Sequence, residues 1–447
     1  MSVTDNSRQQ NWATLYDEHL VELDRRLSVA LDAAERQCLV IFAGHTKYRF
    51  RDDLSYHFAV EPYFKAWVPL TNYPGSALKL VPGKRPILVL LREPGFWHEP
   101  PAAPTGFWVE HFDIREVDSA ETVLDELGKE SANASVIGEA SSQTDAFTHS
   151  NEQTVLNVLD YFRAYKTQYE IACISRANEI AALGHVAARD AFTDGASEFE
   201  LNSVYCRASS QTEPELPYPN IVALNEHASI LHYQNLRRDR PEAARSFLID
   251  AGAQCNGYAS DITRTYSSAD DDFRSLINAM DRLQQTICGE VRDGIAFPDL
   301  NDRAHELLAE VLCDQKLLSC GAEEAYESGI TKSFLPHGLG HFLGLQVHDV
   351  GGRLAGIDGS EHPPSEKHPR LRLTRHLETG VVVTIEPGLY FIPSLLSELR
   401  ESVLGGNVRW DKIDALQVCG GIRVEDDIIV TKDGALNLSR PALQEAA

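Results

Sequence analysis

Three histidines lie close together in a glycine-rich stretch, FLPHGLGHFLGLQVHDVGG, residues 334–352. They are His337, His341 and His348. An imidazole ring can bind a metal ion or carry a proton near neutral pH. A helical zinc pair made by His337 and His341 is disfavoured, because two glycines would lie inside that helical turn. We therefore expect one histidine to bind a metal and the others to line the pocket beside it. A histidine satisfied within the core is the alternative for His337 and His348.

Two aspartates flank a predicted hairpin in FLIDAGAQCNGYASDITRTY. Asn256-Gly257 is a two-residue turn signal, and the register it sets places Asp250 and Asp261 on one face of the sheet. A four-residue turn would put them directly opposite each other, and a three-residue turn would put them on opposite faces. Two carboxylates on one face repel unless a cation lies between them. The alternative is a pair of solvated surface aspartates, which the apolar run SFLI disfavours.

Two glutamates complete a possible ligand set. Glu386 ends the apolar run VVVTI before a Pro-Gly turn, and Glu425 lies inside the predicted strand GGIRVEDD with Arg423 on the same face. Taken alone, Glu386 could be only a turn residue. With Asp250, Asp261 and one histidine, however, these carboxylates form an oxygen-rich set that suits manganese, cobalt or iron better than a structural zinc. Four carboxylates balance two divalent cations, so we predict a dinuclear site whose shared water becomes hydroxide near neutral pH.

The sequences of these motifs and their order along the chain resemble those of the pita-bread metallopeptidases. The resemblance is most specific to the bacterial Xaa-Pro dipeptidases (prolidases), which include organophosphorus acid anhydrolase-type members. The likeness covers nearly the whole chain, because FRDDLSYHFAVEPYFKAWVP, FWHEPP, YPNIVALNEHASILHY and LQVHDVGG also match the family. It implies an α+β fold with a pita-bread C-terminal catalytic domain and a smaller α/β creatinase-like N-terminal domain. We place these domains at residues 161–447 and 1–160.

The resemblance also implies a role for each motif residue. Asp250 would bind one metal, His341 and Glu386 the other, and Asp261 and Glu425 would bridge the two. The ions would be Mn²⁺, with Co²⁺ as the alternative. Glu386 would also pass a proton from the attacking water to the leaving amine. The implied catalytic residues are Glu386, His232, His348 and Arg423, and the implied substrate-binding residues are Tyr218, His232, His337, His348 and Arg423.

A dipeptidase for Xaa-Pro bonds is the function that the resemblance implies. Arg423 is suited to bind the substrate's C-terminal carboxylate, since a guanidinium pairs with it bidentately; a structural salt bridge is the alternative. The family likeness further implies a homodimer in which Asp53 and Trp97 of a second subunit close the pocket. A tetrahedral phosphotriester resembles the intermediate of peptide hydrolysis, so we also expect secondary organophosphorus hydrolase activity. The rival functions are an aminopeptidase P acting on longer peptides and a non-catalytic peptide-binding relative, and the intact ligand set disfavours the second.

The chain as a whole restricts its partners. Its formal net charge is 41 − 66 = −25, which argues against binding nucleic acid or an anionic membrane. The N-terminal stretch lacks the features of a secretory signal, and no apolar run is long enough to span a membrane. Eight scattered cysteines without a CxxC pair are typical of a cytoplasmic protein with reduced thiols.

The positions of these motifs require a particular set of elements. Residues 12–37 have the spacing of an amphipathic helix, and CLVIFAG, ILVLLRE and ASVIGEA are predicted to be buried strands of an α/β unit. Long helices are predicted from Tyr161 to Phe192. From about residue 245 onward strands and hairpins alternate with helices near 270–293 and 300–316, which indicates α+β for this half.

Overall fold

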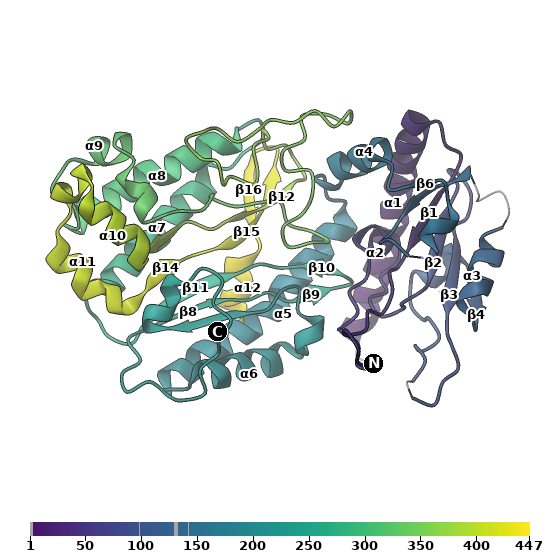
Figure 1. The fold of residues 1–447 in the computed structure, drawn as a ribbon, viewed down its shortest axis with the longest axis horizontal. Coiled ribbons are helices and arrows are strands. Elements are labelled where there is room, and N and C mark those ends of the chain that lie inside the picture. Colours follow the sequence, from purple (N-terminus) through teal and green to yellow (C-terminus); the bar gives the residue numbers. More distant parts are fainter. Residues whose placement is uncertain (1–2, 98, 129–132, 142) are drawn as a thin grey trace. The chain divides into compact units, whose positions relative to one another are not determined.

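The structure is a computed structural model that describes residues 3–97, 99–128, 133–141 and 143–447 (Figure 1). The chain forms two compact units. The first contains the residues up to Cys173 with the short segments Asn256–Tyr258 and Leu354–Glu361, and the second contains the remainder. The boundary predicted at residue 160 falls inside helix α4 (Gln153–Arg163), all of which belongs to the first unit.

A mixed six-stranded sheet forms the centre of the first unit, in the order β4-β3-β2-β1-β5-β6. Its strands are β1 (Leu39–Phe42), β2 (Ala77–Leu80), β3 (Ile87–Leu91), β4 (Asp113–Val117), β5 (Ser135–Ile137) and β6 (His149–Ser150). The β1–β2 and β2–β3 pairs are antiparallel, whereas β1–β5, β3–β4 and β5–β6 are parallel. Val40, Val136 and Val123 of α3 (Ala120–Leu127) are buried in one apolar cluster. The three predicted strands are therefore confirmed as β1, β3 and β5.

The helices of the N-terminal half begin earlier than the sequence predicts. α1 (Val3–Ala34) contains most of the helix expected at residues 12–37. The stretch expected to be helical from Tyr161 is divided between α4 and α5 (Gln168–Thr193), with a break at residues 164–167. The short α2 (Pro62–Trp67) begins with proline, whose fixed φ and missing N–H suit the first helical turn.

The second unit is built from small sheets and helices. Its strands are β7 (Ile221–Leu224), β8 (Ser246–Asp250), β9 (Gln254–Cys255), β11 (Thr263–Ser267), β12 (Val382–Ile385), β13 (Gly388–Tyr390), β14 (Gly421–Arg423), β15 (Asp426–Thr431) and β16 (Gly434–Asn437), and the short β10 (Tyr258–Ala259) begins in the first unit and ends in the second. They form the groups β11-β8-β7, β12-β15-β16, β13-β14 and β10-β9. The remaining α-helices are α6 (Glu198–Ser209), α7 (Asp272–Glu290), α8 (Phe297–Asp314), α9 (Ala322–Glu327), α10 (Pro393–Glu401), α11 (Trp410–Leu416) and α12 (Ser439–Ala446).

Helix α7 shows why the sequence is helical at this point. Asp271 caps its N-terminus by accepting a hydrogen bond from the backbone N–H of Arg274. Phe273, Leu276 and Met280 then recur at helical spacing and are buried. α7 and α8 are the two helices predicted near residues 270–293 and 300–316, and Figure 1 shows α7 beside the strands of the second unit.

The hairpin that carries the two aspartates has the predicted register. Asn256 and Gly257 both have positive φ, 51° and 85°, as a two-residue turn of this type requires. Asp250 pairs with Thr263, and the N–H of Ala251 donates to the carbonyl of Ile262, so the same register continues between the strands. The two-residue turn is therefore confirmed, and the four-residue and three-residue alternatives are wrong.

Two further findings concern the whole chain. All eight cysteines are free thiols. Within the part of the chain that the structure describes, no helix is both long and apolar enough to cross a bilayer.

Candidate metal centre

Asp250 and Asp261 approach each other across the hairpin, and a tyrosine joins them. Asp250 is the last residue of β8, and Asp261 lies two residues before β11. The hydroxyl oxygen of Tyr218 is 2.8 Å from Asp250 Oδ1 and 2.6 Å from Asp261 Oδ1. A phenol has one proton to donate, so it cannot satisfy two ionised carboxylates at once. At least one of the two carboxylates therefore needs a further partner.

His341 presents one ring nitrogen to the same place. Its Nδ1 lies 2.9 Å from the carbonyl oxygen of Phe342, a contact that requires Nδ1 to carry the proton. Nε2 is therefore the ring nitrogen that faces the carboxylates, and it lies 3.5 Å from Asp261 Oδ2 and 3.7 Å from Glu386 Oε1. This is the tautomer of a metal-binding histidine, oriented by a carbonyl group.

A glycine allows the backbone before His341 to lie against β12. A Cβ atom on Gly340 would be 2.0 Å from the carbonyl oxygen of Thr384, so no larger residue fits without a backbone shift. Hydrogen bonds hold the segment there: the N–H of His341 donates to Thr384 Oγ1, and the N–H of Glu386 donates to the carbonyl of Leu339. Residues 335–341 are not helical, which agrees with our rejection of a helical zinc pair.

The two glutamates come from points where strands end. Glu386 follows β12 directly, and its side chain is mostly buried. Glu425 lies in the break between β14 and β15 and makes an isolated bridge with Thr263, so its placement inside a strand was wrong. The hydroxyl of Thr263 donates to Glu425 Oε2 at 2.5 Å. Ligand atoms of Asp261, His341 and Glu425 all lie within 4.8 Å of one another.

The electrostatics of the cluster show an excess of negative charge. Burial raises the pKa of Glu386 to about 7 and that of Glu425 well above its ordinary value. Burial also raises the pKa of Asp250, although the charge of Arg423 opposes this effect. For His341 burial acts to lower the pKa, but the hydrogen bond with Asp261 and the charge of Glu386 raise it to about 9. The oxygen-rich donor set and the crowding of its carboxylates fit divalent cations.

Arg423 is held inside the cluster by three contacts. Its Nη2 donates to Asp250 Oδ2 at 2.5 Å, its Nε to Thr263 Oγ1 at 3.2 Å, and its Nη1 to the hydroxyl of Tyr390 at 2.9 Å. The Tyr390 hydroxyl then lies 2.8 Å from Nε2 of His337, while Nδ1 of His337 lies 2.8 Å from the carbonyl of Gly338. Both nitrogens of His337 are therefore engaged within the protein, and burial lowers its pKa to about 4.

A cavity of about 420 Å³ opens over this cluster. Asp250, Asp261, His341, Glu386 and Glu425, the five predicted ligands, all line it. The other lining residues are Leu231, His232, His337, Gly338, Gly340, His348, Arg353, Arg370, Arg372 and Arg423. His232 and His348 are exposed, and the rings of His341 and His348 make an edge-to-face contact with centroids 4.4 Å apart.

Two predicted residues belong to a different part of the chain. Asp53 and Trp97 lie in the first unit, are exposed, and do not line this cavity. The ring of Trp97 packs on that of Phe96, which is also exposed. His98 of the FWHEPP motif lies outside the described residues.

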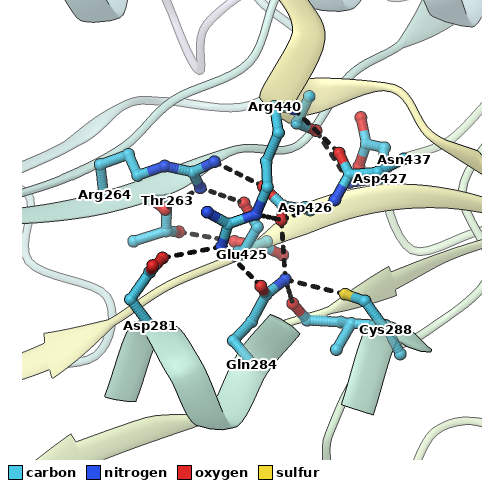
Figure 2. A network of polar contacts seen from close by, with 12 residues as sticks. Thr263, Arg264, Asp281, Gln284, Cys288, Glu425, Asp426, Asp427, Asn437 and Arg440 are labelled. Carbon is cyan, nitrogen blue, oxygen red and sulfur yellow. Dashed lines mark hydrogen bonds and ion pairs between the residues drawn. The ribbon is translucent and has the colours of Figure 1, made fainter. Parts of the chain in front are cut away.

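A buried network next to Glu425 was not predicted from the sequence (Figure 2). The carboxylate of Asp426 is fully buried and accepts hydrogen bonds from four side chains: Arg264, Gln284, Asn437 and Arg440. Arg264 Nη1 also donates to the backbone carbonyls of Thr263, at 2.8 Å, and Glu425, at 2.7 Å. The network therefore holds the backbone on both sides of the bridge that positions Glu425.

A second carboxylate acts in the same way on Asp261. Oδ2 of the buried Asp427 accepts the backbone N–H of Asp261 at 3.1 Å and the side-chain amide of Asn178 at 2.8 Å. The only sequence signal for Asp426 and Asp427 is that two consecutive acids begin an apolar strand, DDIIVT, where one would be expected to face solvent. Both are completely buried.

Comparison with known proteins identifies the family. Residues 172–432 match the model of metallopeptidase family M24, and residues 14–161 match the model of the Xaa-Pro dipeptidase N-terminal domain. The chain belongs to metallopeptidase family M24. It is 45% identical over 439 residues to an Xaa-Pro dipeptidase of Stenotrophomonas maltophilia, covering 98% of this chain and 99% of that protein. An Xaa-Pro dipeptidase of Xanthomonas oryzae pv. oryzae is also 45% identical, with 98% and 100% coverage.

Solved structures with the same fold confirm the predicted fold class. Proline aminopeptidase P II from Yersinia pestis superposes with a TM-score of 0.71 at 22% identity, covering 96% of each chain. Aminopeptidase P from E. coli with the inhibitor Pro-Leu gives 0.70 at 23% identity and 97% coverage of each chain. The M24 chain thus has the expected α+β architecture, a pita-bread catalytic domain preceded by a smaller α/β domain.

Proposed function

We propose that this M24 metallopeptidase hydrolyses Xaa-Pro dipeptides. The observation that carries the proposal is the convergence of Asp250, Asp261, His341, Glu386 and Glu425 on one cavity from four separate parts of the sequence. The substrate class is supported by relatives named Xaa-Pro dipeptidase that align with almost the entire chain. An imide bond to proline lacks an N–H and is sterically shielded, so it calls for a dedicated site.

Two divalent cations are the proposed cofactors, Mn²⁺ by preference and Co²⁺ as the alternative. Asp250 would hold one ion, His341 and Glu386 the other, and Asp261 and Glu425 would bridge them. Such ions polarise a carbonyl oxygen and lower the pKa of bound water. This assignment is supported by the orientation of His341 Nε2 toward Asp261 and Glu386 and by the close approach of Asp250 and Asp261 to one phenol oxygen.

The chain's own residues are proposed to move protons and orient the peptide. Glu386 lies in the cavity wall beside the other proposed ligands, as needed by a group that takes a proton and returns it to the leaving amine. His232 and His348 are exposed on the same wall and are proposed to contact the peptide during catalysis. We propose that Tyr218, His337 and Arg423 complete the substrate-binding site. Tyr218 and Arg423 hold the carboxylates of the hairpin, and His337 lines the cavity.

Direct binding of a substrate carboxylate by Arg423 would require a rearrangement. Its guanidinium already contacts Asp250, Thr263 and Tyr390. We therefore propose that the main effect of Arg423 is to hold Asp250 in place. It would contact the substrate only through a guanidinium N–H that does not bind Asp250, Thr263 or Tyr390.

Several coarser features accompany the proposal. We propose a domain boundary near residue 160, supported by matched segments that end at 161 and begin at 172. A homodimer is proposed in which Asp53 and Trp97 of a second subunit close the cavity; their exposure is compatible with such a contact. A cytoplasmic location is proposed from the eight free thiols, which suit a reducing compartment.

A pair of peptides tests the main activity. The full-length chain loaded with Mn²⁺ should cleave Ala-Pro but not Ala-Pro-Ala, whereas an aminopeptidase P would cleave the tripeptide. Glu386→Gln should abolish turnover; full activity in that variant would refute the role of Glu386. Metal analysis of the same preparations tests the alternative of a non-catalytic peptide-binding relative. Such a protein should lack the metal ions and should bind Ala-Pro without turnover.

Secondary organophosphorus hydrolysis is a separate proposal. A phosphotriester already has tetrahedral geometry at phosphorus, so the same groups could serve attack there. Turnover of a fluorophosphate analogue with Mn²⁺ checks it. A preparation that cleaves Ala-Pro and leaves the analogue intact would eliminate this activity without affecting the dipeptidase proposal.

A further inference from the structure

Three arginines line the cavity without an acidic partner. Arg353, Arg370 and Arg372 lie on its wall together with the predicted metal ligands. Within the described parts of the chain none of the three forms an ion pair, although arginines elsewhere do, such as Arg240 with Glu200. The chain has a net charge of −25, so three unpaired arginines at one cavity are unexpected for a surface that only provides solubility.

The backbone holds these arginines in a defined arrangement. Arg370 and Arg372 are exposed and alternate with Leu371 and Leu373, which are buried at 2% and 0% exposure. Both arginines line the same cavity, while the leucines beside them point into the protein. The segment is tied to the neighbouring one, because the N–H of Thr374 donates to the carbonyl of Gly352 at 2.9 Å.

Hydrogen bonds to neutral groups orient two of the three guanidinium groups. Arg353 Nη2 donates to the carbonyl of Leu371 at 3.1 Å, and Arg370 Nη1 donates to the carbonyl of Pro336 at 3.3 Å. Both arginines therefore retain their full charge and most of their N–H donors for another partner. Leu371 separates Arg370 from Arg372, so its contact with Arg353 brings all three residues to one part of the wall.

Counting charges around the cavity indicates what that partner is. Within the described residues, Arg423 alone of the four arginines that line the cavity is paired with an acidic side chain, that of Asp250. Arg353, Arg370 and Arg372 remain as three positive charges. The C-terminal carboxylate of an Xaa-Pro dipeptide can balance one of them, and a dipeptide with a neutral first side chain offers nothing to the other two.

We propose that Arg353 and Arg370 select dipeptides whose first residue is acidic, Glu-Pro and Asp-Pro. The inference rests on the proposed dipeptidase function and specifies its substrate class. A side-chain carboxylate on the first residue supplies the second negative charge, and planar guanidinium groups pair with carboxylates through two parallel hydrogen bonds. The two residues contribute to specificity and take no part in bond cleavage.

The experiment compares substrates that differ in charge and little in size. kcat/KM is measured for Glu-Pro and Gln-Pro, and for Asp-Pro and Asn-Pro, with the Mn²⁺-loaded full-length chain. We expect each acidic substrate to be preferred about fivefold, which is about 1 kcal/mol and the upper end for charge pairs at a partly exposed site. The preference should fall as the salt concentration rises, because salt screens exposed charges.

A double variant assigns the preference to the two arginines. In Arg353→Gln/Arg370→Gln both ratios should fall to about one, as expected when the charge pairs are removed. Each ratio is taken within one preparation, so a smaller folded or metal-loaded fraction cancels out. Arg282→Gln is the matched control: Arg282 is exposed on α7 and does not line the cavity, and its variant changes the net charge by the same amount per residue and should keep the ratios.

The outcomes separate this inference from the function on which it rests. Cleavage of Ala-Pro with ratios of one or less in the unmodified chain would overturn the inference and leave the dipeptidase proposal standing. Ratios that stay high in the double variant would also overturn it. If neither Ala-Pro nor Gln-Pro is cleaved by the metal-loaded chain, the proposed function fails and the inference fails with it.

Discussion

Replacing Asp426 by asparagine tests whether the buried network positions the proposed metal ligands. The side chain keeps its shape but loses the charge that faces Arg264 at 2.5 Å and Arg440 at 2.7 Å. Asparagine also carries an NH₂ group where the aspartate had an acceptor, so at least one of the four donors around it would meet another donor. Asp426 is completely buried, whereas the side chain of Arg440 is 23% exposed and keeps Asp281 as a second partner.

The expected loss of stability follows from these surroundings. Removing one partner of a buried ion pair typically destabilises by about 3–5 kcal/mol. Partial exposure of Arg440 and its contact with Asp281 reduce the penalty, so we expect a value near the lower end, about 3 kcal/mol. Asp414→Asn removes an exposed ion pair with Arg400, in which both side chains are 50% exposed, and should cost less than about 1 kcal/mol.

Hydrogen exchange is the appropriate assay because the chain has two compact units and one global unfolding energy is not defined for it. The opening free energy of the peptide that contains β15 is measured in metal-free protein. Mn²⁺ affinity is measured by calorimetry on the same samples. A looser Arg264 should free the carbonyl of Glu425, and we expect affinity to fall by about tenfold or more, as for other residues that orient metal ligands.

The double variant Asp426→Asn/Arg264→Met makes the reasoning specific. In Asp426→Asn the charge of Arg264 is left without its buried partner. If this unpaired charge is the main cause of the instability, the double variant should lose less opening free energy than the two single variants lose in sum. Normal β15 protection together with unchanged Mn²⁺ affinity in Asp426→Asn would refute the role assigned to the network. Normal affinity with reduced protection would show that the network stabilises the fold without orienting Glu425.

Three other predictions follow from single contacts. Tyr218→Phe should lower the melting temperature more without Mn²⁺ than with it, because a bound cation would neutralise the carboxylates that the phenol contacts; equal shifts would contradict this. Gly340→Ala should weaken Mn²⁺ binding, since its Cβ would meet the Thr384 carbonyl, whereas Gly289→Ala in α7 has open space and should be neutral or stabilising; equal binding by the two variants would exclude a steric role. Burial lowers the pKa of His305 to about 3, so the unfolded chain binds the extra proton below about pH 6.5 and stability falls with pH towards 3, by about 2 kcal/mol at pH 5. His305→Gln should flatten this dependence in the opening free energy of the α8 peptide, measured by hydrogen exchange at pH 5 and pH 8, and an unchanged slope would exclude His305 as its source.

The hairpin shows which part of the site local sequence can predict. Asn256-Gly257 determines the turn, the turn determines the register, and the register places Asp250 and Asp261 on one face. Each step depends on residues only a few positions apart. Local patterns could not show that His341, Glu386 and Glu425 reach the same point, and that expectation came from the order of the motifs along the chain.

The break at Glu425 shows where local patterns fail. GGIRVEDDIIVT has the composition of one continuous strand, but the structure divides it into β14 and β15. The reason is a set of contacts with residues about 160 positions away: the bridge of Glu425 to Thr263 and the ion pair of Asp426 with Arg264. No periodicity within the segment contains that information, so Asp426 could be assigned only to an exposed position.

Four of the five predicted ligands lie at or beside the end of a regular strand. Asp250 ends β8, Asp261 comes just before β11, Glu386 follows β12, and Glu425 separates β14 from β15. Side chains at such points can converge from different sheets, because the alternation of an unbroken strand no longer dictates their direction. At these points backbone N–H and C=O groups have no hydrogen-bond partner in the sheet. Where such groups are buried, they need hydrogen-bond partners from elsewhere in the protein.

Side chains supply those missing partners next to the ligands. Asp427 accepts the N–H of Asp261, Thr384 accepts the N–H of His341, and Arg264 donates to the carbonyl of Glu425. Each of these bonds fixes a backbone position from which a predicted ligand extends. If a metal set the ligand positions by itself, such bonds would be dispensable, and substitutions in them would alter stability but not metal affinity. Because they are buried and directed at the ligands' own backbone, we expect both properties to change together.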